Sequence, residues 1–350
     1  MRVLIIKMSA LGDIIHALPV LDYLHHVSPG ITVDWVVEAP FREVLEGNPL
    51  INQLHLVQTK LWRKKPLSSE TWADIAAVKK QLREREYDIV FDIQGNLKSG
   101  LICWLSGSKN IFGFSKNELQ ENINQLFTTR QVPIHPQDIH ITDQYLRLVS
   151  TPFDKNFEEL DLTSDIFTLP EDDRAAQARV APLSSGPKIL FHQGTTWETK
   201  YWTDDRWIQL GKSLLNRFND ASILLSWGND TEHSTATAIA AAIGPGAVVL
   251  DRYPLKGFAA LLKRVDVVIG GDTGPVHIAA AVGTPTVSLY RASNGRRSGP
   301  RGKRHVVIQA PMECTACFRT KCSRDHECRE SITAAAVLDG VEKILTCSIK

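Results

Sequence analysis

Short apolar runs alternate with amphipathic segments along most of the chain. The run at 3–7 predicts a strand, and the apolar positions at 13–24 keep a helical spacing. Further strands are predicted at 31–38 and 87–92, with a helix over 71–85 between them. Continuous apolar strands that alternate with helices are typical of a parallel sheet covered on both faces.

A second alternating series begins at residue 188. It predicts strands at 188–192, 221–227, 266–270 and 284–290, and helices at 205–218, 231–243, 254–264 and 275–282. Between the two series, 151–187 is polar and contains Pro152, Pro170, Pro182 and Pro187, as linkers do. A chain of 350 residues also exceeds the usual size of one core. We therefore predict an α/β fold with two Rossmann-like, doubly wound domains, 1–160 and 180–330, that face each other across a cleft. A C-terminal helix over 331–350 could pack back on the first domain.

The composition of the chain limits the kinds of partner that the protein can have. The hydrophobic fraction is 43% and the charged fraction 23%, as in ordinary globular proteins. A formal net charge of +1 argues against a protein that wraps nucleic acid, so anions must be met by local patches. No run is long and apolar enough to span a bilayer, and the first apolar stretch is too short for a signal peptide. We expect a cytoplasmic protein.

The loop after the first strand ends on Gly12 and Asp13. Gly12 permits close backbone approach, and an acidic group in the first turn is stabilised by the helix dipole. Asp13 is equally explained as a helix N-cap. Two phosphate motifs, G-x-x-x-x-G-K-[ST] and G-x-G-x-x-G after the first strand, are missing, which argues against an ATPase and a dehydrogenase.

A glycine-rich loop at 270–277 follows an apolar strand and opens a helix. Pro275 suits the first helical turn, and the small residues Thr273 and Gly274 leave backbone N–H groups able to bind an anion. A capped turn is the alternative. Asp272 would repel phosphate, so we expect it to orient the loop or a lysine, and His277 either reaches phosphate or is a buried structural histidine.

Two further loops follow strands of the second series. Thr195, Thr196 and Lys200 could bind and neutralise phosphate, although an exposed lysine is more often solvated. Glu232 could hold sugar hydroxyls, or Asp230 or Thr231 could merely cap the helix that follows.

Together these loops resemble glycosyltransferase family 9, the lipopolysaccharide heptosyltransferases. The resemblance runs from Ser-Ala-Leu-Gly-Asp at 9–13 through 91–99 to Gly-Asp-Thr-Gly-Pro-Val-His at 271–277, and covers most of the chain. The Gly-Thr-Thr-Trp-x-Thr-Lys-x-Trp form around Lys200 is more similar to heptosyltransferase I than to II. The resemblance implies a GT-B fold, no cofactor, and inverting transfer of L-glycero-D-manno-heptose from ADP-heptose to the first 3-deoxy-octulosonate (Kdo) of Kdo2-lipid A.

The resemblance also implies roles for single residues. Asp13 is the expected base and Lys200 the group that stabilises the departing diphosphate. The expected donor-binding residues are Thr195, Thr196, Lys200, Glu232, Asp272, Thr273, Gly274 and His277. The expected acceptor-binding residues are Ser9, Gly12, Lys60, Trp62, Arg63, Lys64, Gln94, Lys98 and Arg130. We expect the basic stretch 60–65 to be a loop with an interleaved Trp62; a merely solvated face is the alternative.

The expected partners are therefore ADP-heptose, Kdo2-lipid A and the cytosolic face of the inner membrane, where the protein would be peripheral. No nucleic acid is expected. The alternatives are heptosyltransferase II, another GT-B sugar-nucleotide enzyme such as an epimerase, and a non-catalytic nucleotide-sugar-binding or zinc-binding protein.

Four cysteines cluster near the C-terminus, at Cys314, Cys317, Cys322 and Cys328. Their spacing loosely suggests zinc, but the second pair is wider than the C-x2-C of a zinc ribbon. Reduced structural thiols or a disulfide are the alternatives. We expect no metal in the mechanism.

Overall fold

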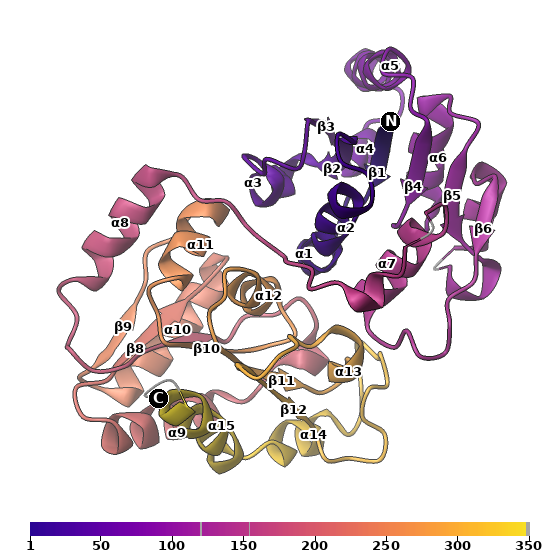
Figure 1. Cartoon of the computed structure of the whole chain (residues 1–350). Coiled ribbons are helices and arrows are strands. Elements are labelled where there is room, and N and C mark those ends of the chain that lie inside the picture. Colours follow the sequence, from indigo (N-terminus) through magenta and orange to yellow (C-terminus); the bar gives the residue numbers. More distant parts are fainter. Residues whose placement is uncertain (120, 154, 348–350) are drawn as a thin grey trace. The chain divides into compact units, whose positions relative to one another are not determined.

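The computed structural model describes residues 1–119, 121–153 and 155–347 (Figure 1). The chain divides into two compact units, Met1–Phe167 and Thr168–Lys350. Their boundary lies inside the polar stretch 151–187. No helix within the described ranges combines the length and the apolar character that a membrane span requires.

The first unit is built on six parallel strands in the order β3-β2-β1-β4-β5-β6. These strands are β1 (Arg2–Ile6), β2 (Thr32–Glu38), β3 (Gln53–Val57), β4 (Ile89–Asp92), β5 (Ile111–Phe114) and β6 (Arg130–Val132). The helices are α1 (Leu11–Ala17), α2 (Pro19–Val27), α3 (Arg42–Leu45), α4 (Thr59–Lys64), α5 (Ser69–Arg83), α6 (Leu97–Ser106) and α7 (Ile141–Ser150), with 3-10 turns η1 (Ala39–Phe41), η2 (Lys116–Glu118), η3 (Asn122–Phe127) and η4 (Phe157–Glu159).

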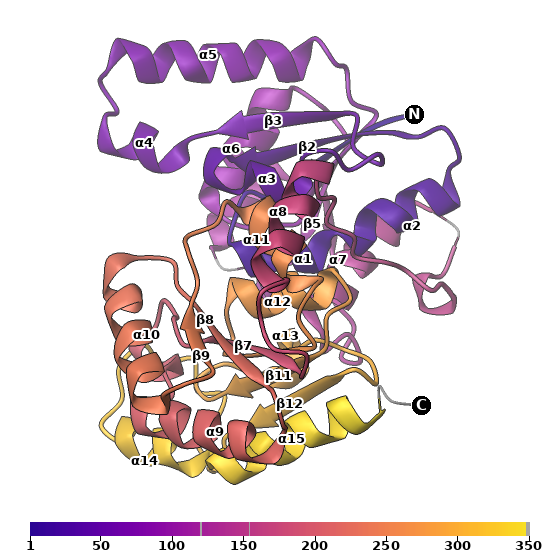
Figure 2. The same cartoon turned by 90° about the vertical axis from the view of Figure 1, so that its left-hand side faces the viewer.

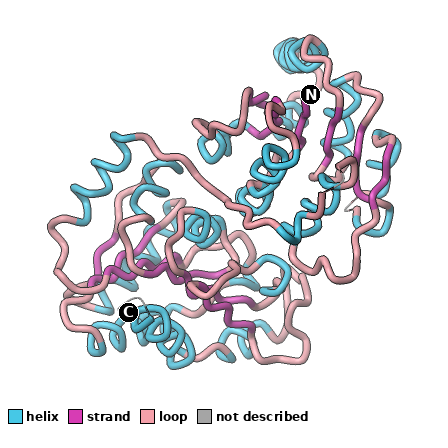
Figure 3. Tube along the Cα trace, viewed as in Figure 1, coloured by secondary structure: helices cyan, strands magenta, loops and turns pink. Residues whose placement is uncertain are grey.

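Alternate strand residues of this sheet serve two cores. Leu4, Ile6 and Val90 pack with Leu82 of α5 and Ile102 of α6. The residues between them are also buried and point to the other face, because side chains alternate along a strand. On that other face lie α1, α2 and α7, which pack on one another. The strands therefore run between two helical layers (Figure 3).

The helix predicted from Asp13 to Leu24 is two helices. Pro19 has no N–H to donate, so the helical hydrogen bonds cannot continue through it. The chain ends α1 at Ala17 and starts α2 with Pro19 as its first residue.

The second unit repeats the same plan, with the strand order β9-β8-β7-β10-β11-β12. Its strands are β7 (Lys188–His192), β8 (Ser222–Ser226), β9 (Ala247–Val249), β10 (Val267–Gly271), β11 (Thr286–Tyr290) and β12 (His305–Gln309). Its helices are α8 (Pro170–Val180), α9 (Asp204–Arg217), α10 (Asp230–Ile243), α11 (Leu255–Leu262), α12 (Gly274–Ala281), α13 (Gly295–Ser298), α14 (Asp325–Ser331) and α15 (Ala334–Cys347), with the 3-10 turn η5 (Glu198–Lys200).

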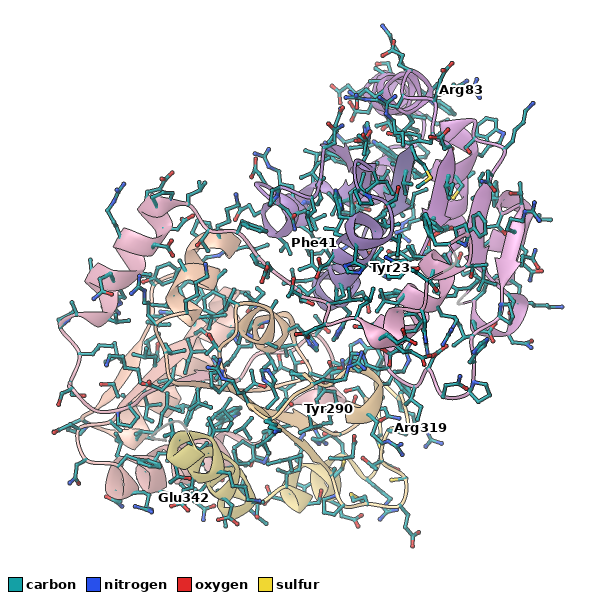
Figure 4. The ribbon with its side chains drawn as sticks, viewed as in Figure 1. Tyr23, Phe41, Arg83, Tyr290, Arg319 and Glu342 are labelled. Atoms are coloured by element: carbon teal, nitrogen blue, oxygen red, sulfur yellow. The ribbon has the colours of Figure 1, made fainter. Side chains whose placement is uncertain are left out.

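The C-terminal helix belongs to the second unit. Val337, Val341 and Ile344 of α15 are buried in one core with strand residues of β7, β8, β10 and β11. Glu342 of α15, labelled in Figure 4, also pairs with Arg217 of α9. Figure 1 shows α9 and α15 on one side of the sheet and α11 and α12 on the other. We expected that this helix could pack on the first domain, but the structure buries it in the core of the second unit. The last residues of the predicted helix, 348–350, lie outside the described residues.

The polar stretch expected as a linker contains α8. Its sequence is too polar to show an apolar face, yet Pro170 at its first position and three acidic residues in its first turn are helix-start signals. The expected domain limit of 180 thus falls on the last residue of a helix that packs against α11.

Candidate active site

Both units have a Rossmann-type switch point. In a sheet of order 3-2-1-4-5-6, a crevice opens at the carboxyl ends of the first and fourth strands, where ligands bind. In the first unit these strands are β1 and β4, and in the second they are β7 and β10. The loops that follow them contain most of the predicted site residues.

The side chain of Gln94 joins the two loops in the first unit. Gln94 follows β4, is 8% exposed, and its Oε1 accepts the backbone N–H groups of Met8 at 3.0 Å and Ser9 at 3.1 Å. Buried Asp92 holds the Gln94 loop in turn, by accepting the N–H groups of Gln94 and Gly95 at 3.0 Å each. The predicted residues Ser9 and Gln94 are therefore brought together.

Asp13 lies three residues after the N-cap of α1, which is Ala10, and not at the cap itself. Its Oδ2 accepts the Ala10 N–H at 3.2 Å. The carboxylate is half-buried and keeps a second oxygen for which no described partner is recorded. Asp13 thus satisfies an orphan helix N–H and can still accept a proton from a ligand at the crevice.

The remaining acceptor candidates are more scattered. Gly12 lies beside Asp13 in α1, and half-buried Lys98 in the first turn of α6 is at the same edge. Arg130 starts β6, so it lies toward the amino-terminal end of the outermost strand, away from the loops after β1 and β4.

The basic stretch 60–65 is mostly a helix and not the expected loop. Lys60, Arg63 and Lys64 are exposed on α4, which begins after the carboxyl end of β3. Trp62 packs against the core of the first unit, which removes most of its ring from any acceptor.

A buried ion cluster joins the two loops in the second unit. The Lys200 Nζ lies 2.6 Å from Asp272 Oδ2, and His277 Nε2 lies 3.1 Å from Asp272 Oδ1. The Lys200 and Asp272 side chains are 14% and 13% exposed, and the Lys200 ammonium also lies 4.7 Å from the centre of the Trp197 ring. Asp272 therefore fixes both the lysine and the histidine.

The neighbours of Asp272 in this cluster determine whether its carboxyl group is ionised. Burial raises the pKa of Asp272, but the hydrogen bonds and charges of His277 and Lys200 outweigh it and hold the pKa well below its ordinary value. The carboxylate stays ionised and keeps Lys200 in place, while the other ammonium protons remain able to meet an anion.

Hydroxyl groups at the same crevice lack partners. The Oγ1 atoms of Thr195, after β7, and Thr273, the N-cap of α12, are buried with no hydrogen-bond partner among the described residues. An unsatisfied buried hydroxyl is costly, so both suit a ligand with acceptor oxygens. Gly274 and its neighbours begin α12 beside them, whereas Thr196 is exposed.

Glu232 is half-buried in the first turn of α10. Its Oε2 accepts the Gly228 N–H at 2.7 Å and its Oε1 accepts from Asn229 Nδ2 at 2.9 Å. The helix cap is Asn229, which accepts the Glu232 N–H at 3.0 Å, so the expected caps Asp230 and Thr231 are wrong. A Cβ on Gly194 would lie 2.4 Å from the Glu232 carboxyl carbon, so any other residue there would have to displace this carboxylate.

Comparison with known proteins decides the family. A model of glycosyltransferase family 9 (heptosyltransferase) matches residues 75–327. Lipopolysaccharide heptosyltransferase 1 of Pseudomonas aeruginosa is 31% identical over 329 residues, which cover 92% of this chain and 88% of the relative. The chain belongs to glycosyltransferase family 9. It is a glycosyltransferase of the heptosyltransferase type, as the four loops suggested.

Other relatives agree. Lipopolysaccharide heptosyltransferase 1 of Escherichia coli K12 is 30% identical over 89% of this chain and 95% of its own. The structure of the Escherichia coli heptosyltransferase WaaC with ADP-2-deoxy-2-fluoro heptose matches with a TM-score of 0.76 and 27% identity over 98% of this chain and 99% of that one. A family 9 structure from Veillonella parvula, with a TM-score of 0.82 and 20% identity over 99% and 97%, supports the GT-B fold alone.

Arg291 is a residue of this glycosyltransferase that the sequence motifs do not reveal. Its side chain is 1% exposed and donates to the backbone oxygen of Tyr201, next to Lys200, and to Asp325 Oδ1 of α14 at 2.6 Å. Thr199 Oγ1 donates to the Arg319 backbone oxygen at 2.6 Å, and Arg319 lies in the irregular segment before α14 (Figure 4). The segment 311–331 therefore braces the loop that carries Lys200.

The four clustered cysteines lie on this brace. Cys314 and Cys317 are exposed, and Cys322 and Cys328 are half-buried, all as free thiols. Burial raises the pKa of the Cys328 thiol, which packs against the core. Within the described ranges, no three potential metal-ligating side chains come together, so the loosely suggested zinc site finds no support in the geometry.

Proposed function

We propose that this protein transfers heptose from ADP-heptose to the first Kdo of Kdo2-lipid A, with inversion at the anomeric carbon. The observation that carries the proposal is the crevice at β7 and β10. There an ion-paired lysine, two unpartnered threonine hydroxyls and a helix N-terminus gather in a family 9 chain. This set suits a diphosphate. Relatives named lipopolysaccharide heptosyltransferase 1, and a WaaC structure with an ADP-heptose analogue, support the choice of sugar and nucleotide.

The proposed chemistry is a single displacement. Asp13 takes the proton of the acceptor hydroxyl while that oxygen bonds to the anomeric carbon. The bond from this carbon to the phosphate oxygen breaks, and ADP leaves with the electron pair. Lys200 and the N-terminus of α12 stabilise the negative charge that develops on the diphosphate. Glu232 would hold hydroxyl groups of the donor.

The proposal divides the substrates between the units. The nucleotide sugar binds at the β7 and β10 loops. The acceptor binds at the β1 and β4 loops, where Ser9, Gly12, Gln94 and Lys98 lie. The acceptor is lipid-borne, so the protein would work peripherally at the cytosolic face of the inner membrane.

Mass spectrometry of Kdo2-lipid A after incubation with the enzyme and ADP-heptose tests the proposal. We expect a mass gain of one heptose and an equal amount of ADP. ADP-glucose and an acceptor that already carries the first heptose are the controls. Transfer only to the heptosylated acceptor would point to heptosyltransferase II, and release of ADP without a glycosylated product would refute the transfer.

A further inference from the structure

Three large apolar side chains lie uncovered near the beginning of α5. Leu61 on α4, Leu67 in the connection and Trp72 on α5 are 41%, 93% and 62% exposed. We call residues 59–72 the α4–α5 tip; it lies beyond the carboxyl end of β3 (Figure 2). Single exposed apolar residues are ordinary, but three large ones within twelve residues of the chain need an explanation.

The tip is held firmly from its inner side. Trp62 of α4 and Ile75 of α5 pack against the core of the first unit. Thr71 Oγ1 donates to the Lys65 backbone oxygen at 2.8 Å, and the Ser68 N–H donates to the same oxygen at 3.1 Å. The outward direction of Leu67 and Trp72 thus follows from a fixed backbone whose other side is already buried.

Positive charge surrounds the apolar side chains. Lys60, Arg63, Lys64 and Lys65 are exposed, and no ion pair with a described residue is recorded for any of them. Residues 59–69 include no aspartate or glutamate; the one acidic residue of the tip is Glu70, Asp74 follows on α5, and buried Glu38 of β2 accepts a hydrogen bond from Thr59 Oγ1. The four cations of the tip therefore outnumber its one acidic residue, and they lie close along the chain to two exposed leucines and a tryptophan.

We propose that the α4–α5 tip docks this enzyme on the surface of an anionic phospholipid bilayer. Tryptophan and leucine enter the interfacial layer of a bilayer, and flanking lysine and arginine meet the lipid phosphates. A protein partner fits less well, because lysine is depleted from protein interfaces. The inference rests on the proposed function in one respect: a lipid-borne acceptor gives the enzyme a reason to be there.

The position of the tip supports this role. Helix α4 begins two residues after β3 ends, at the carboxyl edge of the sheet, where the β1 loop also lies. The strands β3 and β1 are separated by β2 alone, so the two loops leave the sheet about 10 Å apart. A tip seated in the bilayer surface would keep the proposed acceptor edge next to the lipid that carries the acceptor.

Vesicle flotation of the purified full-length protein tests the inference. The probe is a vesicle of phosphatidylethanolamine and phosphatidylglycerol that contains no Kdo2-lipid A, compared with one of phosphatidylcholine alone. We expect the wild type to float with the anionic vesicles and to be released by salt. The double variant Leu67→Ser, Trp72→Ser should lose at least tenfold in partition coefficient, and Lys64→Gln, Lys65→Gln roughly fivefold for each charge removed.

Matched control variants distinguish vesicle binding through the tip from nonspecific binding by other exposed apolar or charged residues. Leu126→Ser removes another leucine, 80% exposed, on η3, and Lys212→Gln, Lys303→Gln removes two exposed charges from the second unit. Both should float like the wild type. Equal flotation of the Leu67→Ser, Trp72→Ser variant and the wild type would overturn the inference. So would a wild type that ignores vesicles and uses the tip for self-association, seen as a dimer that becomes monomeric in that variant.

The proposed function can fail independently. Flotation on acceptor-free vesicles needs no turnover, so it tests docking alone. Turnover of a deacylated, water-soluble Kdo acceptor should be the same for the wild type and the Leu67→Ser, Trp72→Ser variant. Loss of that turnover in the variant would mean that the tip serves the active site and not the bilayer.

Discussion

Asp13 combines a local structural task with the chemistry proposed for it. Asparagine at this position keeps an oxygen that can accept the Ala10 N–H but cannot take up a proton. We expect Asp13→Asn to lower kcat about a hundredfold or more, the usual range for loss of a general base, with the donor KM little changed. Steady-state kinetics with ADP release as the readout checks this.

The matched control is Asp172→Asn, because Asp172 accepts the Leu169 N–H at 3.2 Å in the first turn of α8, as Asp13 accepts that of Ala10 in α1. It should leave kcat within about twofold, since helix-end charges affect stability by less than about 1 kcal/mol. If both variants turned over like the wild type, Asp13 would be a capping residue only.

Lys200 is held by Asp272 before any ligand arrives. If its free ammonium protons meet the leaving diphosphate, Lys200→Ala should lower kcat/KM for the donor by roughly 1–3 kcal/mol of transition-state stabilisation. Asp272→Asn should lose part of the same transition-state stabilisation. The double variant should lose less than the sum of the two single losses, because the two groups act as a pair. Additive losses in this double-mutant cycle would show that they act independently.

Asp272 also links stability to pH. Its pKa in the folded protein lies below the ordinary value of 3.8, so the unfolded carboxyl binds its proton at a higher pH than the folded one. The contribution is therefore complete above about pH 5 and is lost as pH falls further. We expect the Tm of the wild type to drop more steeply between about pH 5 and 3 than that of Asp272→Asn. Parallel Tm curves would contradict the assignment.

At the level of the elements, we expect the segment 311–331, which braces the Lys200 loop through Arg291, to affect donor binding. Lysine in place of Arg291 keeps the charge but cannot reach Tyr201 and Asp325 together. We expect Arg291→Lys to raise the Kd for ADP about tenfold, the cost of one lost buried hydrogen bond of about 1–2 kcal/mol. Calorimetric titration with ADP measures it.

Arg206→Lys is the control for that change, because Arg206 ties α9 to Glu330 of α14, at 2.8 Å, without touching the Lys200 loop. It should change the Kd for ADP by less than about twofold. An equal effect of both variants would assign Arg291 to general stability.

The central strands and their loops were predictable, and the edges were not. Strands β1, β4, β7 and β10 are continuous apolar runs because both their faces are covered, and the loops after them contain the recognisable motifs. No such run marks β3, whose buried His55 bonds to Tyr87 in a polar cluster under α5. Arg291 had no local signal either, since its partner Asp325 is 34 residues further along the chain.

For the whole molecule, each unit is a continuous segment with its own sheet and core. We expect residues 168–350 produced alone to unfold cooperatively and to bind ADP within about threefold of the full chain, as independent domains do. Residues 1–167 should fold but not bind ADP. Thermal unfolding with and without ADP distinguishes these outcomes, and a fragment 168–350 that fails to fold would make its stability depend on the first unit.

The burial of α15 in the second core has a consequence for synthesis. Nascent chains fold from the amino terminus as they leave the ribosome. The first unit has all its strands and helices by residue 167 and can fold while translation continues. The second cannot close its core until Val337, Val341 and Ile344 have been made, long after its first strand β7. One face of its sheet therefore stays uncovered while the segment between β7 and α15 is synthesised, so the second unit exposes apolar surface for longer than the first.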